Sequence, residues 1–131
     1  MVSILFMEGV RLLKTRALNA YERAFDAIEA GDYDWAIFLL EQAFQLLIKY
    51  ILALKLGYFP RVHSISRLLE EAEEVSNEFP DFLARYRNQI AVLEDAYIAS
   101  RYYPRRYREE DVRDKLEIFK ELLELVERHE E

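Results

Sequence analysis

The chain has 131 residues, 52% of them apolar and 33% charged, which suits a single domain over residues 1–131 with a core and a solvated surface. The absence of cysteine excludes disulfides and thiolate metal sites, and only two histidines are present, far apart in the sequence, so we expect no metal site. The net charge of −7 excludes a surface that is basic all over, so any site for an anion must be local.

Only three glycines and three prolines are present, which favours long helices over a fold of many strands. Apolar residues at three- and four-residue steps predict a first helix from Ser3 or Glu8 to Glu29. A second helix is expected from a capping Asp34 to Lys55, before a glycine. Its apolar residues, Trp35 among them, fill an arc of about 200°, wider than the ~100° stripe of a helix that lies on a surface. We therefore expect this helix to be central.

The narrower polar side of that second helix also carries apolar residues. This arrangement predicts a groove, or a contact with another helix or with a second subunit. A solvated face is the alternative for its polar members. The residues concerned are Phe38, Gln42, Gln45, Ile48, Lys49 and Leu52.

The remaining pattern predicts three more helices, over residues 64–77, 81–98 and 109–129. Pro80 should stop the third of the five and Asp81 cap the fourth. Short connections favour antiparallel neighbours, so the expected fold is an all-α, up-and-down bundle of about five helices, four long and one shorter. No apolar run approaches the ~20 residues that span a bilayer, and the apolar start is too short for a signal peptide. We expect a cytoplasmic protein without a membrane partner.

Residues 101–108 read Arg-Tyr-Tyr-Pro-Arg-Arg-Tyr-Arg, which places four arginines and three tyrosines in one stretch of an acidic chain. We name these eight residues the basic segment. Guanidinium groups bind phosphates through paired hydrogen bonds, and tyrosine rings stack on bases. The segment therefore predicts a site for a phosphate or nucleotide, built from Arg101, Tyr102, Arg105 and Arg106. The alternative is a solvated loop whose arginines balance the negative charge of the glutamate-rich helices.

Arg61 and His63 precede the third expected helix, where the start of a helix favours anions. They could complete a site with the basic segment, or His63 could simply pack at the helix start. There is no glycine-rich phosphate loop, glycine-flanked serine or cysteine nucleophile. We therefore assign no catalytic residue and expect no cofactor.

Four stretches of the chain resemble the HEPN family, in the same order and spacing: residues 31–36, 41–49, 60–65 and 100–104. They read Gly-Asp-Tyr-Asp-Trp-Ala, Glu-Gln-Ala followed by Lys49, Pro-Arg-Val-His-Ser-Ile, and Ser-Arg-Tyr-Tyr-Pro. The resemblance implies a four- to five-helix bundle that often pairs as a homodimer. It also implies a link to minimal nucleotidyltransferases, because many members are encoded with them or fused to them. Some members are ribonucleases of toxin–antitoxin systems, and others are thought to bind nucleotides.

The ribonuclease branch of that family uses an arginine followed five to seven residues later by histidine, because cleavage of RNA needs a proton carrier near the phosphate. Here neither His63 nor His129 has an arginine at that distance upstream, and Arg101 is followed at those offsets by Arg-Tyr-Arg. We therefore expect a non-catalytic module that binds a nucleotide or RNA, acts with a nucleotidyltransferase-like protein and forms a homodimer. DNA is not an expected partner. The alternatives are a divergent ribonuclease and a dimer that serves protein contacts only.

Overall fold

The computed structural model describes residues 3–58, 60–102 and 106–131; the side chains of residues 100–102 are not among those described. Within this part of the chain there are six α-helices and a short 3₁₀ helix, without a strand, which confirms the all-α prediction. The elements are α1 (Ile4–Glu29), α2 (Tyr33–Leu56), α3 (Ile65–Glu71), the 3₁₀ helix η1 (Ala72–Glu74), α4 (Glu78–Arg85), α5 (Arg87–Tyr102) and α6 (Glu109–Arg128).

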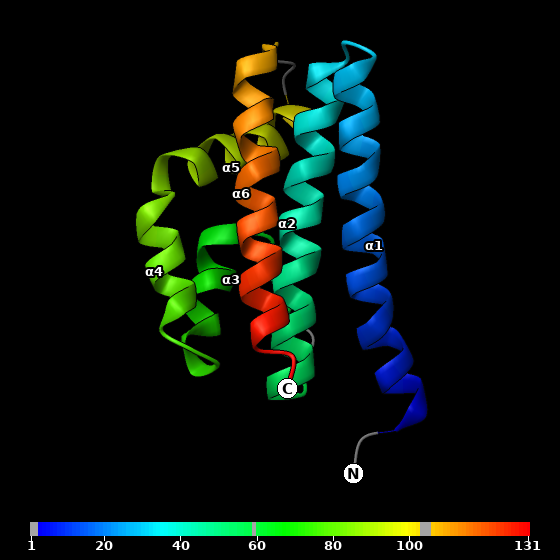
Figure 1. Cartoon of the computed structure of the whole chain (residues 1–131), viewed down its shortest axis with the longest axis vertical. Coiled ribbons are helices and arrows are strands. Elements are labelled where there is room, and N and C mark those ends of the chain that lie inside the picture. Colours follow the sequence, from blue (N-terminus) through cyan, green and yellow to red (C-terminus); the bar gives the residue numbers. More distant parts are fainter. Residues whose placement is uncertain (1–2, 59, 103–105) are drawn as a thin grey trace.

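Three long helices, α1, α2 and α6, run along the long axis of the bundle (Figure 1). Helices α1 and α2 are antiparallel neighbours joined by a tight turn. The shorter helices α3 and α4, with α5, lie on the opposite flank and return the chain to the end at which α2 began. Helix α6 therefore runs in the same direction as α2 (Figure 1).

The centre of the bundle is α2, as its wide apolar arc predicts. It contacts α1, α3, α5 and α6, so its neighbours cover nearly its whole circumference. By length and composition α2 could cross a membrane, contrary to the expectation that no apolar run is long enough, but 67% of its most apolar window is buried inside the bundle. Phe119 of α6 joins three helices at the centre, because its ring stacks on Tyr21 of α1 at 4.8 Å and meets Phe44 of α2 edge-on at 5.4 Å.

The turn between α1 and α2 differs in one detail from the prediction. Gly31 takes the left-handed conformation with φ +78°, and the side chain of Asp32, not Asp34, caps α2 by accepting a hydrogen bond from the N–H of Trp35 at 3.3 Å. Asp34 already lies inside the first turn of the helix, where its carboxylate is free to serve another segment. Gly57, with φ +80°, ends α2 in the left-handed position expected after a helix.

The middle of the chain departs further from the prediction. The helix expected over residues 64–77 ends as α3 at Glu71 and continues only as the 3₁₀ helix η1. Pro80 does not stop a helix but lies in the first turn of α4, where the N–H that proline lacks would have no partner in any case. The helix expected to begin at Asp81 is interrupted at Tyr86, which separates α4 from α5. The chain bends there, and α5 crosses the top of the flank in Figure 1.

One end of the bundle is tied by a charged cluster around Lys14 of α1. Its ammonium contacts Glu127 at 3.1 Å and Glu130 at 2.6 Å, and Glu130 also accepts a hydrogen bond from the hydroxyl of Tyr50 at 2.9 Å. Burial lowers the pKa of Lys14, but the hydrogen bonds to the two glutamates outweigh it, so the net shift is upward. These contacts join α1, α2 and the residues after α6.

Candidate functional site

A narrow strip of α2 is left partly uncovered by the neighbouring helices. Trp35 is 52% exposed, and Phe38, Gln42 and Lys49 are half-buried. At 100° per residue the four side chains project within about 60° of one another, so they form one row along the helix. We name these four residues the α2 strip. The rings of Trp35 and Phe38 stack with their centroids 5.2 Å apart and an angle of 20° between them.

Ile48 and Leu52 do not belong to this open strip. Both are fully buried, and Gln45 is only 4% exposed. Of the alternatives that the sequence left open, contact with another helix of the same chain is therefore the one that the structure shows for the two apolar residues. The prediction that Ile48 and Leu52 are exposed for contact with a second subunit is wrong, because they lie on the side of α2 that its own neighbours cover.

A buried carboxylate, that of Glu41, lies beside the α2 strip. It accepts hydrogen bonds from the side-chain amides of Gln42, at 2.6 Å, and of Gln45. Burial lowers the pKa of the Lys49 ammonium, and the negative charge of Glu41 offsets part of that shift. The two glutamines predicted as groove residues thus hold a buried acid in place, and the sequence pattern alone did not single out Glu41.

The start of α3 is occupied by a carboxylate of the protein itself. Glu94 of α5 accepts hydrogen bonds from the Ser64 hydroxyl at 2.6 Å, and from the N–H and hydroxyl of Ser66 at 3.2 and 2.9 Å. Ser64 also caps α3 by accepting from the N–H of Arg67 at 3.2 Å. The attraction of this helix start for an anion is therefore already satisfied by Glu94.

His63 lies next to α5, two residues after Arg61. The exposed ring of His63 stacks on Tyr97 with centroids 5.7 Å apart, and Arg61 is exposed. Arg101 follows Tyr97 by four residues in α5, one helical turn or about 6 Å along the axis. The fold thus brings the segment before α3 to within a turn of the first residue of the basic segment.

The basic segment is only partly described. Arg101 and Tyr102 are the last residues of α5, but their side chains, and all of Arg105, lie outside the described part of the chain. Arg106 is exposed. The N–H of Tyr107 donates a 2.8 Å hydrogen bond to the carboxylate of Asp34, which fastens the segment to the first turn of α2, next to Trp35.

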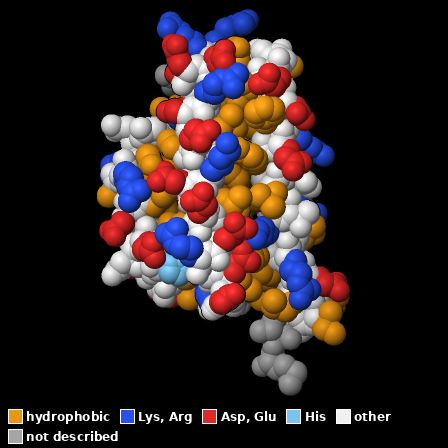
Figure 2. Space-filling model, in the orientation of Figure 1, with side chains coloured by type: hydrophobic (Ala, Val, Ile, Leu, Met, Phe, Trp, Pro, Cys, Tyr) orange, Lys and Arg blue, Asp and Glu red, His pale blue; other side chains and the backbone are white. Residues whose placement is uncertain are grey.

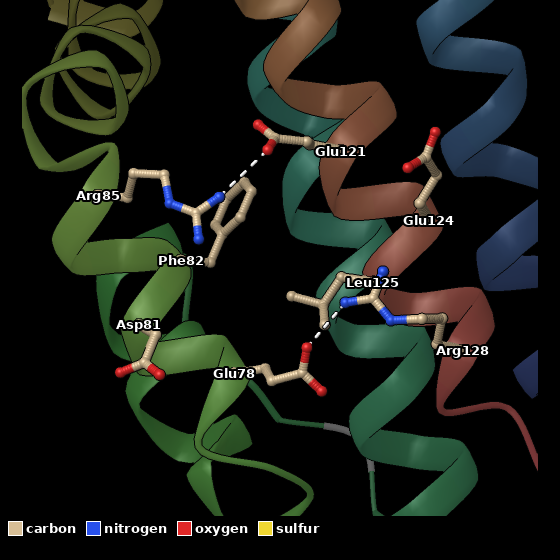
Figure 3. A pocket seen from close by; sticks show the side chains of 8 residues that line it. All are labelled: Glu78, Asp81, Phe82, Arg85, Glu121, Glu124, Leu125 and Arg128. Carbon is tan, nitrogen blue, oxygen red and sulfur yellow. Dashed lines mark hydrogen bonds and ion pairs between the residues drawn. The ribbon is translucent and has the colours of Figure 1, made fainter.

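A groove with a volume of about 260 Å³ lies between α4 and α6 and is lined largely by charged side chains (Figure 3). Arg85 contacts Glu121 at 3.2 Å, and Arg128 contacts Glu78 at 2.7 Å. The hydrogen bonds from Arg128 and His129 lower the pKa of Glu78. These pairs connect the two helices across the groove, which accounts for them without a ligand.

The surface on that side of the bundle is electrically mixed. Acidic and basic side chains alternate over α4 and α6, and a strip of hydrophobic side chains follows the seam between α6 and α1 (Figure 2). No broad basic surface is visible on this side, in keeping with the net charge of −7. Among the described residues, no group of three or more His, Asp or Glu side chains is placed to hold a metal ion.

Comparison with known proteins agrees with this architecture. The family model of the HEPN domain matches residues 10–129. The chain belongs to the HEPN family. Among solved structures, this HEPN domain is similar to TT1696 from Thermus thermophilus, with a TM-score of 0.73, 25% sequence identity, and coverage of 92% of this chain and 97% of that one. No curated protein matches it.

Proposed function

We propose that this HEPN domain is a non-catalytic binding module for a nucleotide or for RNA. The phosphate is held by Arg101, Arg105 and Arg106 and a base by Tyr102, with Arg61 and His63 contributing from the start of α3. The observation that carries the proposal is the fastening of the basic segment to α2 through Tyr107 and Asp34, with Arg106 exposed. In a chain of net charge −7, this is a local cationic site.

The proposal also covers the partner protein, the oligomeric state and the location in the cell. The HEPN family commonly pairs with nucleotidyltransferases, and we propose such a protein as the partner, in the cytoplasm, with the module acting as a homodimer of the toxin–antitoxin kind. The missing arginine–histidine spacing supports a binding role over cleavage. The half-buried Phe38, Gln42 and Lys49 leave room for a second candidate, a dimer that serves protein contacts only.

The test is a binding titration of a labelled single-stranded RNA and of labelled ATP at low salt, followed by fluorescence anisotropy. Binding should weaken as salt rises, and the loss of one phosphate contact in Arg106→Ala should lower the slope of log K against log salt by about 0.7 for a single strand. Arg101→Ala should weaken binding as well. The matched control is Arg11→Ala, an exposed arginine of α1, which should bind like the wild type.

Four results would contradict the proposal. If neither RNA nor ATP bound, the proposed ligand would be wrong. If Arg101→Ala and Arg106→Ala bound like the wild type, the proposed site would be wrong. RNA cleavage that survives repurification and disappears in Arg101→Ala would make the chain a divergent ribonuclease. A stoichiometric protein partner recovered without nucleotide would favour the role in protein contacts.

A further inference from the structure

Trp35 is the single tryptophan of the chain and is more than half exposed, at 52%. A large aromatic ring in water forgoes the free energy of burial, so its exposed surface is available to a ligand. The sequence pattern assigned Trp35 to the buried arc of α2. The structure instead places it at the edge of that arc, where it opens the α2 strip.

The ring of Trp35 packs against a second aromatic ring of the same helix. One of its faces stacks against Phe38, at 5.2 Å and 20°, and its backbone N–H is held by the capping carboxylate of Asp32. With one face covered by Phe38 and half of its surface exposed, the indole presents a flat apolar face to solvent. A planar ring can stack on such an exposed aromatic face.

The segment that carries a cation, Arg106, is fastened to the same helical turn as Trp35. Tyr107 is bonded through its N–H to the carboxylate of Asp34, the residue before Trp35, so the backbone that carries the exposed Arg106 is held beside the first turn of α2. The carboxylates of Asp32 and Asp34 both accept hydrogen bonds from backbone N–H groups. Such bonds are charge-assisted and hold both carboxylates against the backbone.

We propose that Trp35, backed by Phe38, is the stacking platform for a nucleobase whose phosphate is met by Arg106. This rests on the proposed function, in which Tyr102 stacks on a base, and adds Trp35 and Phe38 as a further aromatic platform for it. The ligand chemistry is an aromatic base attached to a phosphate, supplied either by a free nucleotide or by single-stranded RNA. The alternative occupant, a second copy of this chain, is an outcome of the test below.

The experiment uses Trp35 as its own reporter, because excitation of the only tryptophan isolates its emission. The full chain is titrated with ATP, with a short single-stranded RNA, and with inorganic tripolyphosphate as a phosphate without a base. We expect quenching of the emission either by both ATP and RNA or by RNA alone. Tripolyphosphate, which has no base, should leave the emission unchanged. Quenching by ATP identifies the source as a nucleotide, and quenching by RNA alone identifies it as a strand.

Variants separate the base from the phosphate. Stacking on an aromatic ring contributes enough that Trp35→Ala should weaken binding about 5- to 150-fold, as measured by anisotropy, while Trp35→Phe should lose less. Arg106→Ala should weaken binding but leave the quenching at saturation unchanged. The matched control is Tyr58→Ala, an aromatic residue 40% exposed at the other end of α2, which should bind like the wild type.

Several results would overturn the inference. If RNA binds with Trp35 emission unchanged and with full affinity in Trp35→Ala, the platform is wrong while the proposed function stands. If neither probe binds, the proposed function fails and the inference fails with it. Equal quenching by tripolyphosphate would exclude a base. A blue shift that grows with protein concentration in the absence of ligand would assign Trp35 to contact with a second copy.

Discussion

Phe119 is the side chain whose loss should cost the bundle most, because one ring joins α1, α2 and α6. It is fully buried, stacks on Tyr21 and meets Phe44 edge-on. Replacing a buried phenylalanine by alanine costs about 3–5 kcal/mol through lost burial and the cavity left behind. Because two aromatic pairs are lost as well, we expect Phe119→Ala to cost about 4 kcal/mol.

That loss is a large share of the total for a domain, which is about 5–15 kcal/mol. With a urea dependence of about 2 kcal/mol per molar, the midpoint should fall by about 2 M, measured by circular dichroism at one fixed protein concentration. The control is Phe25→Ala on α1, whose ring is 45% exposed and which should cost less than about 1 kcal/mol. A midpoint shift for Phe119→Ala no larger than that of Phe25→Ala would refute this packing of the three helices.

Three further predictions concern single contacts. Burial and the hydrogen bond to Glu130 raise the pKa of Tyr50 to about 12. The folded state then holds this proton more tightly than the unfolded state, in which the pKa of tyrosine is about 10. The free energy of unfolding should therefore fall as pH rises from about 10 to 12. In urea melts over that range, Tyr50→Phe should lose less of this free energy than the wild type. Gly57→Ala should cost about 1 kcal/mol, seen as a lower melting temperature, because φ is +80° while the added Cβ meets nothing within 4 Å; a gain would contradict this. Ser64→Ala removes the cap of α3 and a bond to Glu94, so its urea midpoint should report a loss of about 1–2 kcal/mol, and Ser64→Thr should lose less.

The long helices could be predicted closely because their apolar spacing persists over many turns. Helix α6 begins at Glu109 as expected and ends at Arg128, one residue before the expected end. The ends of α2 carry local signals that the sequence displays, a glycine on each side and an aspartate at the start. The choice between Asp32 and Asp34 as the cap could not be made, because both satisfy the same preference and the turn geometry decides.

The middle of the chain was less predictable because its signals conflict. Pro80 is compatible with a helix stop and equally with a first turn, and the structure adopts the second. The break at Tyr86 has no proline or glycine to announce it. There the packing of α5 across the flank of the bundle, a tertiary effect, outweighs the local preference for a continuous helix.

Exposure around α2 shows the same limit for the candidate site. Periodicity gives the angle at which a side chain leaves the helix, but not which neighbours lie at that angle. Ile48 and Leu52 fall among polar residues and are fully buried, whereas Trp35 falls in the apolar arc and is exposed. The covering helices come from distant parts of the sequence, so no local pattern reveals where their cover ends.

Glu94 at the start of α3 has a consequence for how any phosphate would approach. A group tethered by the fold competes at an effective concentration in the millimolar range or above, roughly that of a short flexible link. A free anion would have to outcompete this resident carboxylate and leave two serine hydroxyls to find new acceptors. The start of α3 is therefore occupied by Glu94, and an incoming phosphate is directed to an exposed cationic side chain such as that of Arg106.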